Sequence, residues 1–387
     1  MNKKIPLMLL PLIAFILYGI LGTFGYGNDP DTYGMLYSGQ KLWHGLGYEA
    51  SRFQGSVVTE VCVGLGSLVG GFYLTNLLSA LLGATTLFLF LQIAVPYLGE
   101  DRARWICALL AFNPWYIIAC SSSMDYVYGF FFLILALWLA LRQQWVLTAL
   151  SLALTISARL SNLPLASMLA IGICIHLVKH ERYHKVIAFC LVGFLATAAL
   201  YFPVFQQAGY NLSFLPSGVA TWSLKSIAAR FIYKNIYLFG LIPFALLLVA
   251  AIQYLRRSTL PCAFPFTAVL LGWVAFVIQE YLFLKFPLEI SYLIPLILLL
   301  STLIWSKNVP VLLLKMMVLF TLLFNVVNLQ ILKIEYKDDP DAVEAINAHP
   351  SFFIEKGPVI KDVAERSASQ RYNFKKYALP FHTNAIQ

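Results

Sequence analysis

Charged residues are scarce in this 387-residue chain. Only 12% of its residues are Asp, Glu, Lys or Arg, whereas 60% are hydrophobic, and the mean hydropathy is +0.76. So few charges cannot cover the surface of an ordinary water-soluble domain. The shortage excludes that class, and the recurrent apolar runs predict an all-α polytopic membrane protein.

The chain also lacks paired cysteines and a concentrated basic face. Its six cysteines stand singly in apolar surroundings without C-x-x-C spacing, so neither a zinc site nor a disulfide framework is predicted. The formal net charge is +9, but the basic residues are scattered through short loops. Membrane lipids are therefore the expected partners of these charges, and nucleic acid is not.

Apolar runs separated by short loops predict about eleven transmembrane helices. The first is interpreted as a retained helix, because no A-x-A-like cleavage site with a polar mature region follows it. The expected spans are residues 5–26, 73–95, 105–121, 126–142, 145–159, 162–178, 186–205, 231–255, 262–284, 288–305 and 309–329. With the N-terminus inside, every inner loop is basic and the acidic residues gather outside, which predicts an extracytoplasmic active site.

Two segments depart from this pattern. Within the transmembrane domain, residues 1–330, the segment 27–72 is a long extracytoplasmic loop in which apolar residues at helical spacing predict an interfacial helix. These residues are Tyr33, Leu36, Tyr37, Leu42 and Trp43. Glycines at 64, 66, 70 and 71 then interrupt the approach to the second span. Residues 331–387 form a polar C-terminal tail, too poor in apolar residues to predict an independent fold.

Two carboxylates, Asp29 and Asp31, stand at the start of the long loop. In a structural interpretation, Asp29 is the N-cap of the interfacial helix, Pro30 begins its first turn and Asp31 complements the helix dipole. In a functional interpretation, the two acids take a proton from a sugar or lipid hydroxyl, or bind a divalent cation such as Mg²⁺ or Mn²⁺ over a phosphate. Capping does not need two acids, so both remain candidate catalytic residues and candidate metal ligands.

Further polar residues fall on the same predicted face of the membrane. Arg52 has the planar fork that clamps a phosphate, although contact with lipid head groups explains it equally well. Asp125 opens the span 126–142 either as a helix cap or as a functional acid. Arg159 lies near the outer interface, where a charge is costly unless it is paired or hydrated. Glu60 adds a further acid to this group.

Four short motifs resemble the GT-C superfamily of polytopic glycosyltransferases. In chain order they are Asp29-x-Asp31-x-Tyr33, Tyr48-x-x-Ser51-Arg52-x-x-Gly55 with Glu60, Asp125-Tyr126, and Ala158-Arg159-Leu160-Ser161. The likeness is closest to bacterial members related to the dolichyl-phosphate-mannose protein mannosyltransferases and the lipid A aminoarabinose transferases. It extends over the architecture of residues 1–305.

The resemblance implies transfer of a sugar from a polyprenyl-phosphate carrier to a lipid, glycan or protein acceptor, with inversion, on the outer face of a bacterial inner membrane. Asp29 or Asp31 would be the base, with Asp29 slightly favoured. Arg52 and Arg159 would bind the phosphate, and Glu60 and Asp125 would orient these groups or bind sugar hydroxyls.

A late segment, residues 286–295, also resembles the family. Such enzymes often carry an Arg-Tyr pair before a proline there. Here Ser291 replaces the arginine beside Tyr292, which leaves Lys285 as a substitute phosphate ligand. Lys285 and Tyr292 are therefore candidate substrate-binding residues.

Two other classes fit the composition. A transporter or lipid flippase also has many helices and intramembrane charges, but such proteins tend to show related halves with ionisable groups near the bilayer midplane. This chain shows no convincing repeat, and its acids gather at one interface. A non-catalytic partner in envelope glycan assembly would share the fold and lack the activity.

Overall fold

The computed structural model describes residues 6–52, 54–210, 224–256, 262–285, 289–307, 309–336 and 345–366. These residues are mostly helical, and the chain divides into two compact units. Unit 1 consists of residues 1–93, 117–217 and 362–387, and unit 2 consists of residues 94–116 and 218–361. The described residues of each unit are considered separately.

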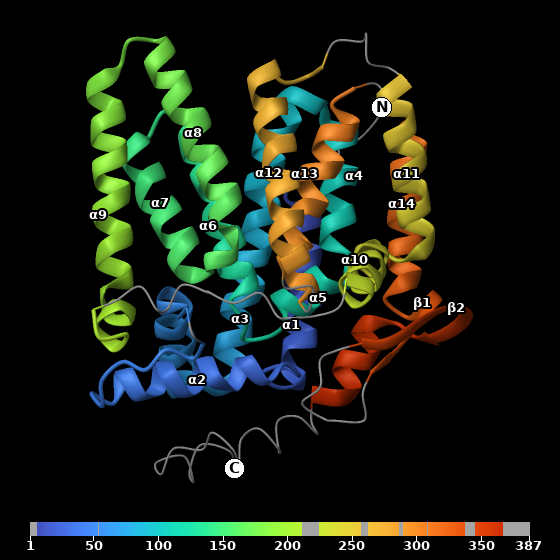
Figure 1. The fold of residues 1–387 in the computed structure, drawn as a ribbon, viewed down its shortest axis with the longest axis horizontal. Coiled ribbons are helices and arrows are strands. Elements are labelled where there is room, and N and C mark those ends of the chain that lie inside the picture. The colour runs from blue at the N-terminus through green and yellow to red at the C-terminus, as the bar shows by residue number, and fades with distance from the viewer. Residues whose placement is uncertain are drawn as a thin grey trace. The chain divides into compact units, whose positions relative to one another are not determined.

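Unit 1 contains the first helices and the middle of the chain. Its elements are α1 (Leu9–Leu21), η1 (Gly22–Phe24), α2 (Pro30–Trp43), most of α3 (Val57–Leu98), the end of α5 (Pro114–Cys120), α6 (Tyr126–Leu141), α7 (Trp145–Ala158), η2 (Leu160–Asn162), α8 (Leu163–Lys179) and α9 (Tyr183–Gln207). Helices α6 to α9 run side by side, and α2 lies across their ends (Figure 1). The long loop therefore contains a helix at the predicted place, and its position in the membrane interface stays a prediction.

Helix α3 is longer than the predicted span 73–95, because it begins already at Val57. Two of its glycines leave helical geometry, Gly70 with φ −146° and Gly71 with φ +58°, and the helix is kinked there. A positive φ is accessible to glycine at little cost. The predicted interruption of the approach is thus found at 70 and 71, whereas 64 and 66 lie within continuous helix.

Unit 2 contains the second half of the chain. Its elements are the end of α3, α4 (Glu100–Ala111), the start of α5, α10 (Leu224–Phe239), α11 (Leu241–Arg256), α12 (Phe266–Lys285), η3 (Ile290–Leu293), α13 (Ile294–Trp305), α14 (Val311–Phe324), β1 (Val327–Tyr336) and β2 (Ala345–Lys356). The strands pair antiparallel, and a final helix, 358–366, leads back into unit 1. The two-stranded sheet is an addition to the predicted all-α architecture.

The expected span 231–255 consists of two helices with a break between them. Gly240, with φ +87°, ends α10, and the two helices are bent by 93° at this residue. Only a residue without a Cβ adopts this conformation readily, so the apolar run continues while the helix does not.

Among the described residues, four helices are long and apolar enough to cross a membrane, or up to six if each bent pair counts as one span. Further apolar helices of 10–17 residues occupy most of the other predicted spans. This is the architecture of a polytopic helical membrane protein.

Candidate active site

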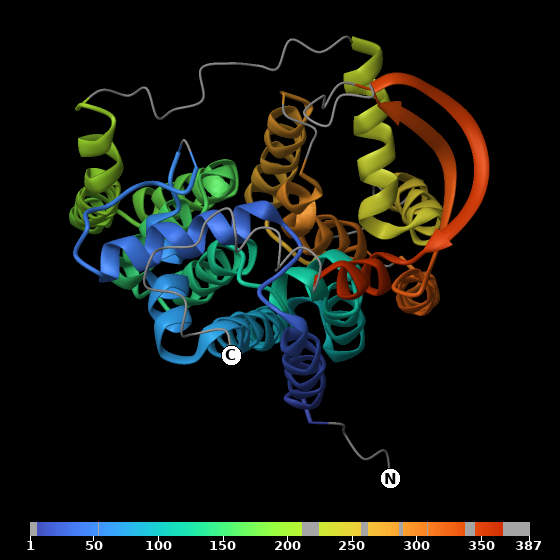
Figure 2. The ribbon, with the colours of Figure 1, turned by 90° about the horizontal axis from the view of Figure 1, so that it is seen from below.

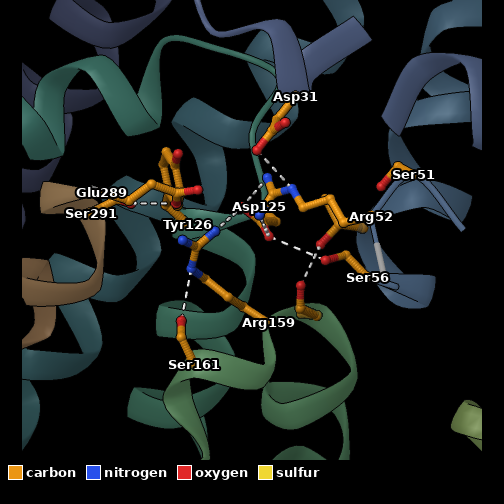
Figure 3. Close-up of polar contacts among 12 residues, drawn as sticks. Asp31, Ser51, Arg52, Ser56, Asp125, Tyr126, Arg159, Ser161, Glu289 and Ser291 are labelled. Carbon is orange, nitrogen blue, oxygen red and sulfur yellow. Dashed lines mark hydrogen bonds and ion pairs between the residues drawn. The ribbon is translucent and has the colours of Figure 1, made fainter. Parts of the chain in front are cut away.

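Asp125 is the centre of a buried charge cluster within unit 1 (Figure 3). Its side chain is 0% exposed and forms ion pairs with two guanidinium groups, those of Arg52, at 3.2 Å, and Arg159. Ser56 Oγ also donates to Asp125 Oδ2, at 3.2 Å. Although Asp125 precedes α6, its side chain makes no capping hydrogen bond. Its carboxylate is instead used to hold two cations side by side.

Arg52 links this buried carboxylate to the first acidic motif. Its Nε lies 3.0 Å from Asp31 Oδ2, and its side chain is 11% exposed, against 39% for Asp31. A planar guanidinium can contact two anions through different edges, which a lysine cannot do. Asp31, Arg52, Asp125 and Arg159 therefore form one alternating chain of charges whose accessible end is Asp31.

Asp29 has the capping geometry that the sequence predicts. Its Oδ1 accepts a hydrogen bond from the Asp31 backbone N–H at 2.9 Å, and Pro30 occupies the first turn of α2. Its Oδ2 accepts from the Tyr126 hydroxyl at 3.1 Å. The Tyr126 ring in turn lies against the Arg159 guanidinium, 4.1 Å from its centroid. The helix cap is thus joined through one aromatic ring to the cation cluster.

Arg159 enters the cluster because α7 ends at it. The residue has extended backbone angles, φ −158° and ψ 110°, between α7 and η2. This turn directs its side chain to Asp125, while its Nε donates to Ser161 Oγ at 2.9 Å. The sequence predicts that the Arg159 charge needs a partner, and the fully buried Asp125 carboxylate is that partner.

Glu60 holds the loop that carries Arg52. The carboxylate is fully buried and accepts hydrogen bonds from the Ser51 N–H at 2.9 Å, the Ser51 hydroxyl at 2.5 Å and the Tyr48 hydroxyl at 2.6 Å. The Ser56 N–H is 3.3 Å from the same carboxylate. Burial raises the pKa of Tyr48, and the Glu60 charge adds to this effect, so the phenol remains a donor. Glu60 therefore positions Arg52 through the loop backbone.

A close helix crossing places Glu60 beneath that loop. A Cβ added to Gly39 of α2 would lie 2.0 Å from the Glu60 carbonyl oxygen and 2.7 Å from Gly64 Cα. Only two residues without side chains allow α2 and α3 to approach so closely. The small residue at 64, predicted as a helix break, serves instead as a contact surface.

A second network fixes the two loops that lead into Asp29 and Asp125. Asn76 of α3 is buried and donates to the carbonyl oxygens of Gly22 and Gly25 at 2.8 and 2.7 Å. Its Oδ1 is 2.8 Å from Ser123 Oγ, and the Ser123 N–H donates to the Tyr26 carbonyl at 2.7 Å. One amide side chain thus ties the end of α1 to the turn before α6.

The helix 358–366 braces the same two loops. Arg366 is only 1% exposed and donates to the Leu21 carbonyl at 3.0 Å and the Ser121 carbonyl at 2.7 Å. Asp362 balances its charge at 2.6 Å. The two carbonyls belong to the ends of α1 and α5, where helices leave unsatisfied acceptors. Residues 367–387 of the predicted polar tail lie outside the described residues.

The acidic residues present do not fit a divalent cation. The Asp31 carboxylate is paired with Arg52, and both oxygens of Asp29 accept hydrogen bonds. Within the described part of the chain, no cluster of three or more His, Cys, Asp or Glu could hold a metal ion. A guanidinium beside the carboxylates repels a second cation. We therefore assign no step to Mg²⁺ or Mn²⁺.

Lys285 and Tyr292 belong to unit 2. Lys285 is the last residue of α12, and its ammonium lies 4.9 Å from the centre of the Tyr281 ring. The Tyr292 carbonyl, in η3, accepts a hydrogen bond from Gln279 at 3.0 Å. Their assignment to substrate binding stays a prediction.

Sequence reasoning missed three contributors: Ser56, Asn76 and Arg366. Asn76 gave a usable signal, because a lone amide within a long apolar run needs a partner. Ser56 and Arg366 gave none, since a serine beside a loop glycine and an arginine in a polar segment are both common.

Comparisons with known proteins bear on the fold. No protein-family model and no curated protein matches the sequence. Among solved structures, the chain is similar to ArnT from Cupriavidus metallidurans bound to undecaprenyl phosphate, with a TM-score of 0.58 and 12% identity over 77% of this chain and 59% of that one. The apo state of ArnT gives a TM-score of 0.57 and 13% identity over 77% and 58%.

The predicted resemblance is thus confirmed at the level of the fold, which this chain shares with a solved structure. The neighbour that shows it is ArnT, a lipid A aminoarabinose transferase. This chain spans about three fifths of the length of the ArnT structures.

Proposed function

We propose that this chain is a membrane glycosyltransferase that moves a sugar from a polyprenyl-phosphate carrier to an acceptor, with inversion at the anomeric carbon. The observation that supports this most is Asp125, a fully buried carboxylate that holds Arg52 and Arg159 together beside an exposed acid, Asp31. Fixed cations next to an accessible carboxylate are what transfer from a lipid phosphate requires. The ArnT fold, seen with undecaprenyl phosphate bound to ArnT, supports the choice of carrier.

The charge change of the reaction explains why two arginines are useful. The acceptor hydroxyl oxygen forms a bond to the anomeric carbon, and the bond from that carbon to the phosphate oxygen breaks. The phosphate leaves with the electron pair, so a diester with one negative charge becomes a monoester with nearly two. Arg52 and Arg159 stabilise the charge that develops on the leaving oxygen.

The resting cluster has no spare positive charge, because Asp31 and Asp125 balance the two arginines. A donor phosphate therefore competes with Asp31 for Arg52. The phosphate displaces Asp31 and not Asp125 from Arg52, because Asp31 is partly exposed whereas Asp125 is buried between both arginines. Once the donor phosphate has displaced Asp31 from Arg52, the Asp31 carboxylate is free to accept a proton.

Asp31 is accordingly the base that takes the acceptor proton. Asp29, which sequence reasoning slightly favours, is already engaged as the cap of α2 and by Tyr126. Its role is to hold Asp31 and the Tyr126 ring in position. This division gives the two acids of the first motif separate tasks.

The membrane arrangement proposed with this function has eleven spans, with Asp31, Arg52 and Asp125 on the extracytoplasmic face of a bacterial inner membrane. The charge bias of the loops supports this side. An impermeant thiol reagent tests it in cells of a cysteine-free variant, by comparing single cysteines at positions 31 and 182. Labelling from outside at 182 would reverse the orientation.

The test of the activity uses purified protein in lipid nanodiscs and a polyprenyl-phosphate donor with a radiolabelled sugar. We expect release of polyprenyl phosphate, loss of that release in Asp125→Asn, and no response to EDTA. Asp101→Asn is the matched control, because Asp101 is an exposed acid outside the cluster. Full release by Asp125→Asn would contradict the proposed site, and activity that depends on added Mg²⁺ would contradict the metal-free step.

A further inference from the structure

The two-stranded sheet of unit 2 has one polar and one apolar face. Asn328 and Gln330 are buried, and both donate to Glu355, at 2.5 and 3.2 Å. Gln330 also contacts the Tyr233 hydroxyl of α10 at 3.4 Å. The face that carries Asn328, Gln330 and Glu355 therefore packs against α10.

The other face carries large apolar side chains that the described residues of unit 2 leave exposed. Phe352 is 69% exposed and Ile354 is 65% exposed. Leu329 pairs directly with Ile354 across the sheet, and Val327 and Ile331 alternate with it along β1. The hairpin curves around the outside of α10 and α11 (Figure 2). So many exposed apolar side chains mark a surface that is not bathed in bulk water.

The apolar face continues the outer side of α14. Exposed apolar residues of α14 recur at helical spacing, and the exposed Val326 follows them in the turn before β1; those of α14 are Leu312, Met316, Leu319 and Leu323. The sheet is also fixed to the end of this helix. The Gly357 N–H donates to the Val326 carbonyl at 2.7 Å, and a Cβ on Gly357 would lie 2.4 Å from the Phe324 carbonyl oxygen.

Helix length sets the depth of the sheet. At 1.5 Å per residue, the 14 residues of α14 cover about 21 Å, less than the ~30 Å of the hydrocarbon core. Asn325 and Val326 continue the turn of the helix, which brings the length to about 24 Å, and β1 begins at Val327, near the edge of the hydrocarbon. A two-stranded sheet has unpaired backbone groups along both edges, which hydrocarbon cannot satisfy. The sheet must then lie at the boundary between acyl chains and head groups.

The positive charges at this face favour lipids with anionic head groups. Lys333 of β1 and Lys356 of β2 are exposed, and Glu355 is turned inward. Lysines at such a position bury their stems and extend the ammonium to lipid phosphates. We propose that the outward face of β1 and β2 is a lipid-binding surface that docks into the bilayer interface and prefers anionic lipids.

The first test is a spin label at single cysteines in a variant whose six native cysteines are replaced, reconstituted in vesicles of phosphatidylcholine and phosphatidylglycerol. Labels at 352 and 354 are compared with a lipid reference at 319 on α14 and an aqueous reference at 181. We expect frequent collisions with oxygen at 352 and 354, as at 319, and few with a water-soluble nickel chelate. Dominant nickel collisions, as at 181, would place the face in water and overturn the proposal.

A second result would overturn it equally. If the labels at 352 and 354 collide with neither reagent, another protein surface or a second copy covers the sheet. The preference for anionic lipid is tested separately with Lys333→Gln combined with Lys356→Gln. This variant should lose the decrease in nickel collisions that phosphatidylglycerol causes at 352. An unchanged decrease would show that the lysines do not contact the head groups.

Discussion

The Arg366 guanidinium donates to the carbonyl oxygen of Ser121 at 2.7 Å, four residues before the acid that binds both site arginines. A segment that sequence reasoning left without structure therefore holds the turn before Asp125. The Arg366 charge that makes these contacts is buried, so a substitution that removes it should change the stability of the protein.

Arg366→Gln should lower the free energy of unfolding by about 3–5 kcal/mol, because it leaves the Asp362 charge buried without its partner. Burial already raises the pKa of Asp362, while Arg366 opposes the increase. An acid whose pKa is raised on folding stabilises below its unfolded pKa and loses this as pH rises through the folded value. The variant should thus approach wild-type stability as pH falls. Thermal melts between pH 4 and 8 measure this, and a pH-independent difference would contradict it.

Asp31→Asn should separate binding from chemistry. Because the substitution frees Arg52 from its ion pair, we expect the KM for the lipid donor to fall. Because it removes the base, kcat should fall by about 10²-fold or more. Initial rates over a range of donor concentrations give both values. An unchanged kcat with a lower KM would move the base to another residue.

Asp29→Asn should keep the fold, since asparagine caps helices about as well as aspartate. We expect a nearly unchanged melting temperature and a smaller loss of kcat than in Asp31→Asn. Asp29→Ala removes the cap and should cost about 1 kcal/mol of stability. If Asp29→Asn slows transfer more than Asp31→Asn does, the two acids exchange roles.

Arg52→Lys and Arg159→Lys keep the charge and lose the planar fork. Each arginine contacts Asp125 and a second group, so each lysine should lose one of these contacts. Transfer should slow by roughly 10- to 100-fold, the worth of one charge-assisted hydrogen bond. Arg104→Lys, at an exposed pair with Glu100, is the control and should be neutral. Wild-type rates in both site variants would make them lipid-contact residues.

Gly39→Ala should disturb the site from a distance. The added Cβ would overlap the Glu60 carbonyl oxygen, so α2 must move away from α3. We expect a loss of about 1–3 kcal/mol in stability and slower transfer, because Glu60 holds the Arg52 loop. Gly19→Ala adds a Cβ with nothing within 4 Å and should be neutral. A stable Gly39→Ala protein would show that the helices can separate freely.

The sequence predicts those parts of the molecule that depend on local chemistry. Pro30 after Asp29 identifies the cap of α2, because capping involves neighbours in the chain. The apolar runs locate most helices for the same reason. The break at Gly240 was missed, since an isolated glycine in an apolar run is also tolerated within a helix.

In the candidate site, too, the sequence predicts which residues take part but does not predict how they pair. Asp31, Arg52, Asp125 and Arg159 were named from charge at a membrane face, and the structure brings them together. That Asp125 would hold both arginines, and that Glu60 would bind loop backbone, depends on contacts between distant segments. Nothing in the spacing of these residues specifies such pairing.

Arg366 also gives the protein an order of assembly. The carbonyls that it contacts belong to residues 245 and 345 positions earlier in the chain, so they are synthesised and inserted long before it. While translation proceeds through the second half, the end of α1 and the turn before Asp125 still lack their hydrogen bonds to Arg366. The helices that carry the site are therefore inserted into the membrane before Arg366 can stabilise the turns between them. A ribosome stalled before position 366 would leave an inserted chain whose turns have the hydrogen bonds of Asn76 and Ser123 but lack those of Arg366.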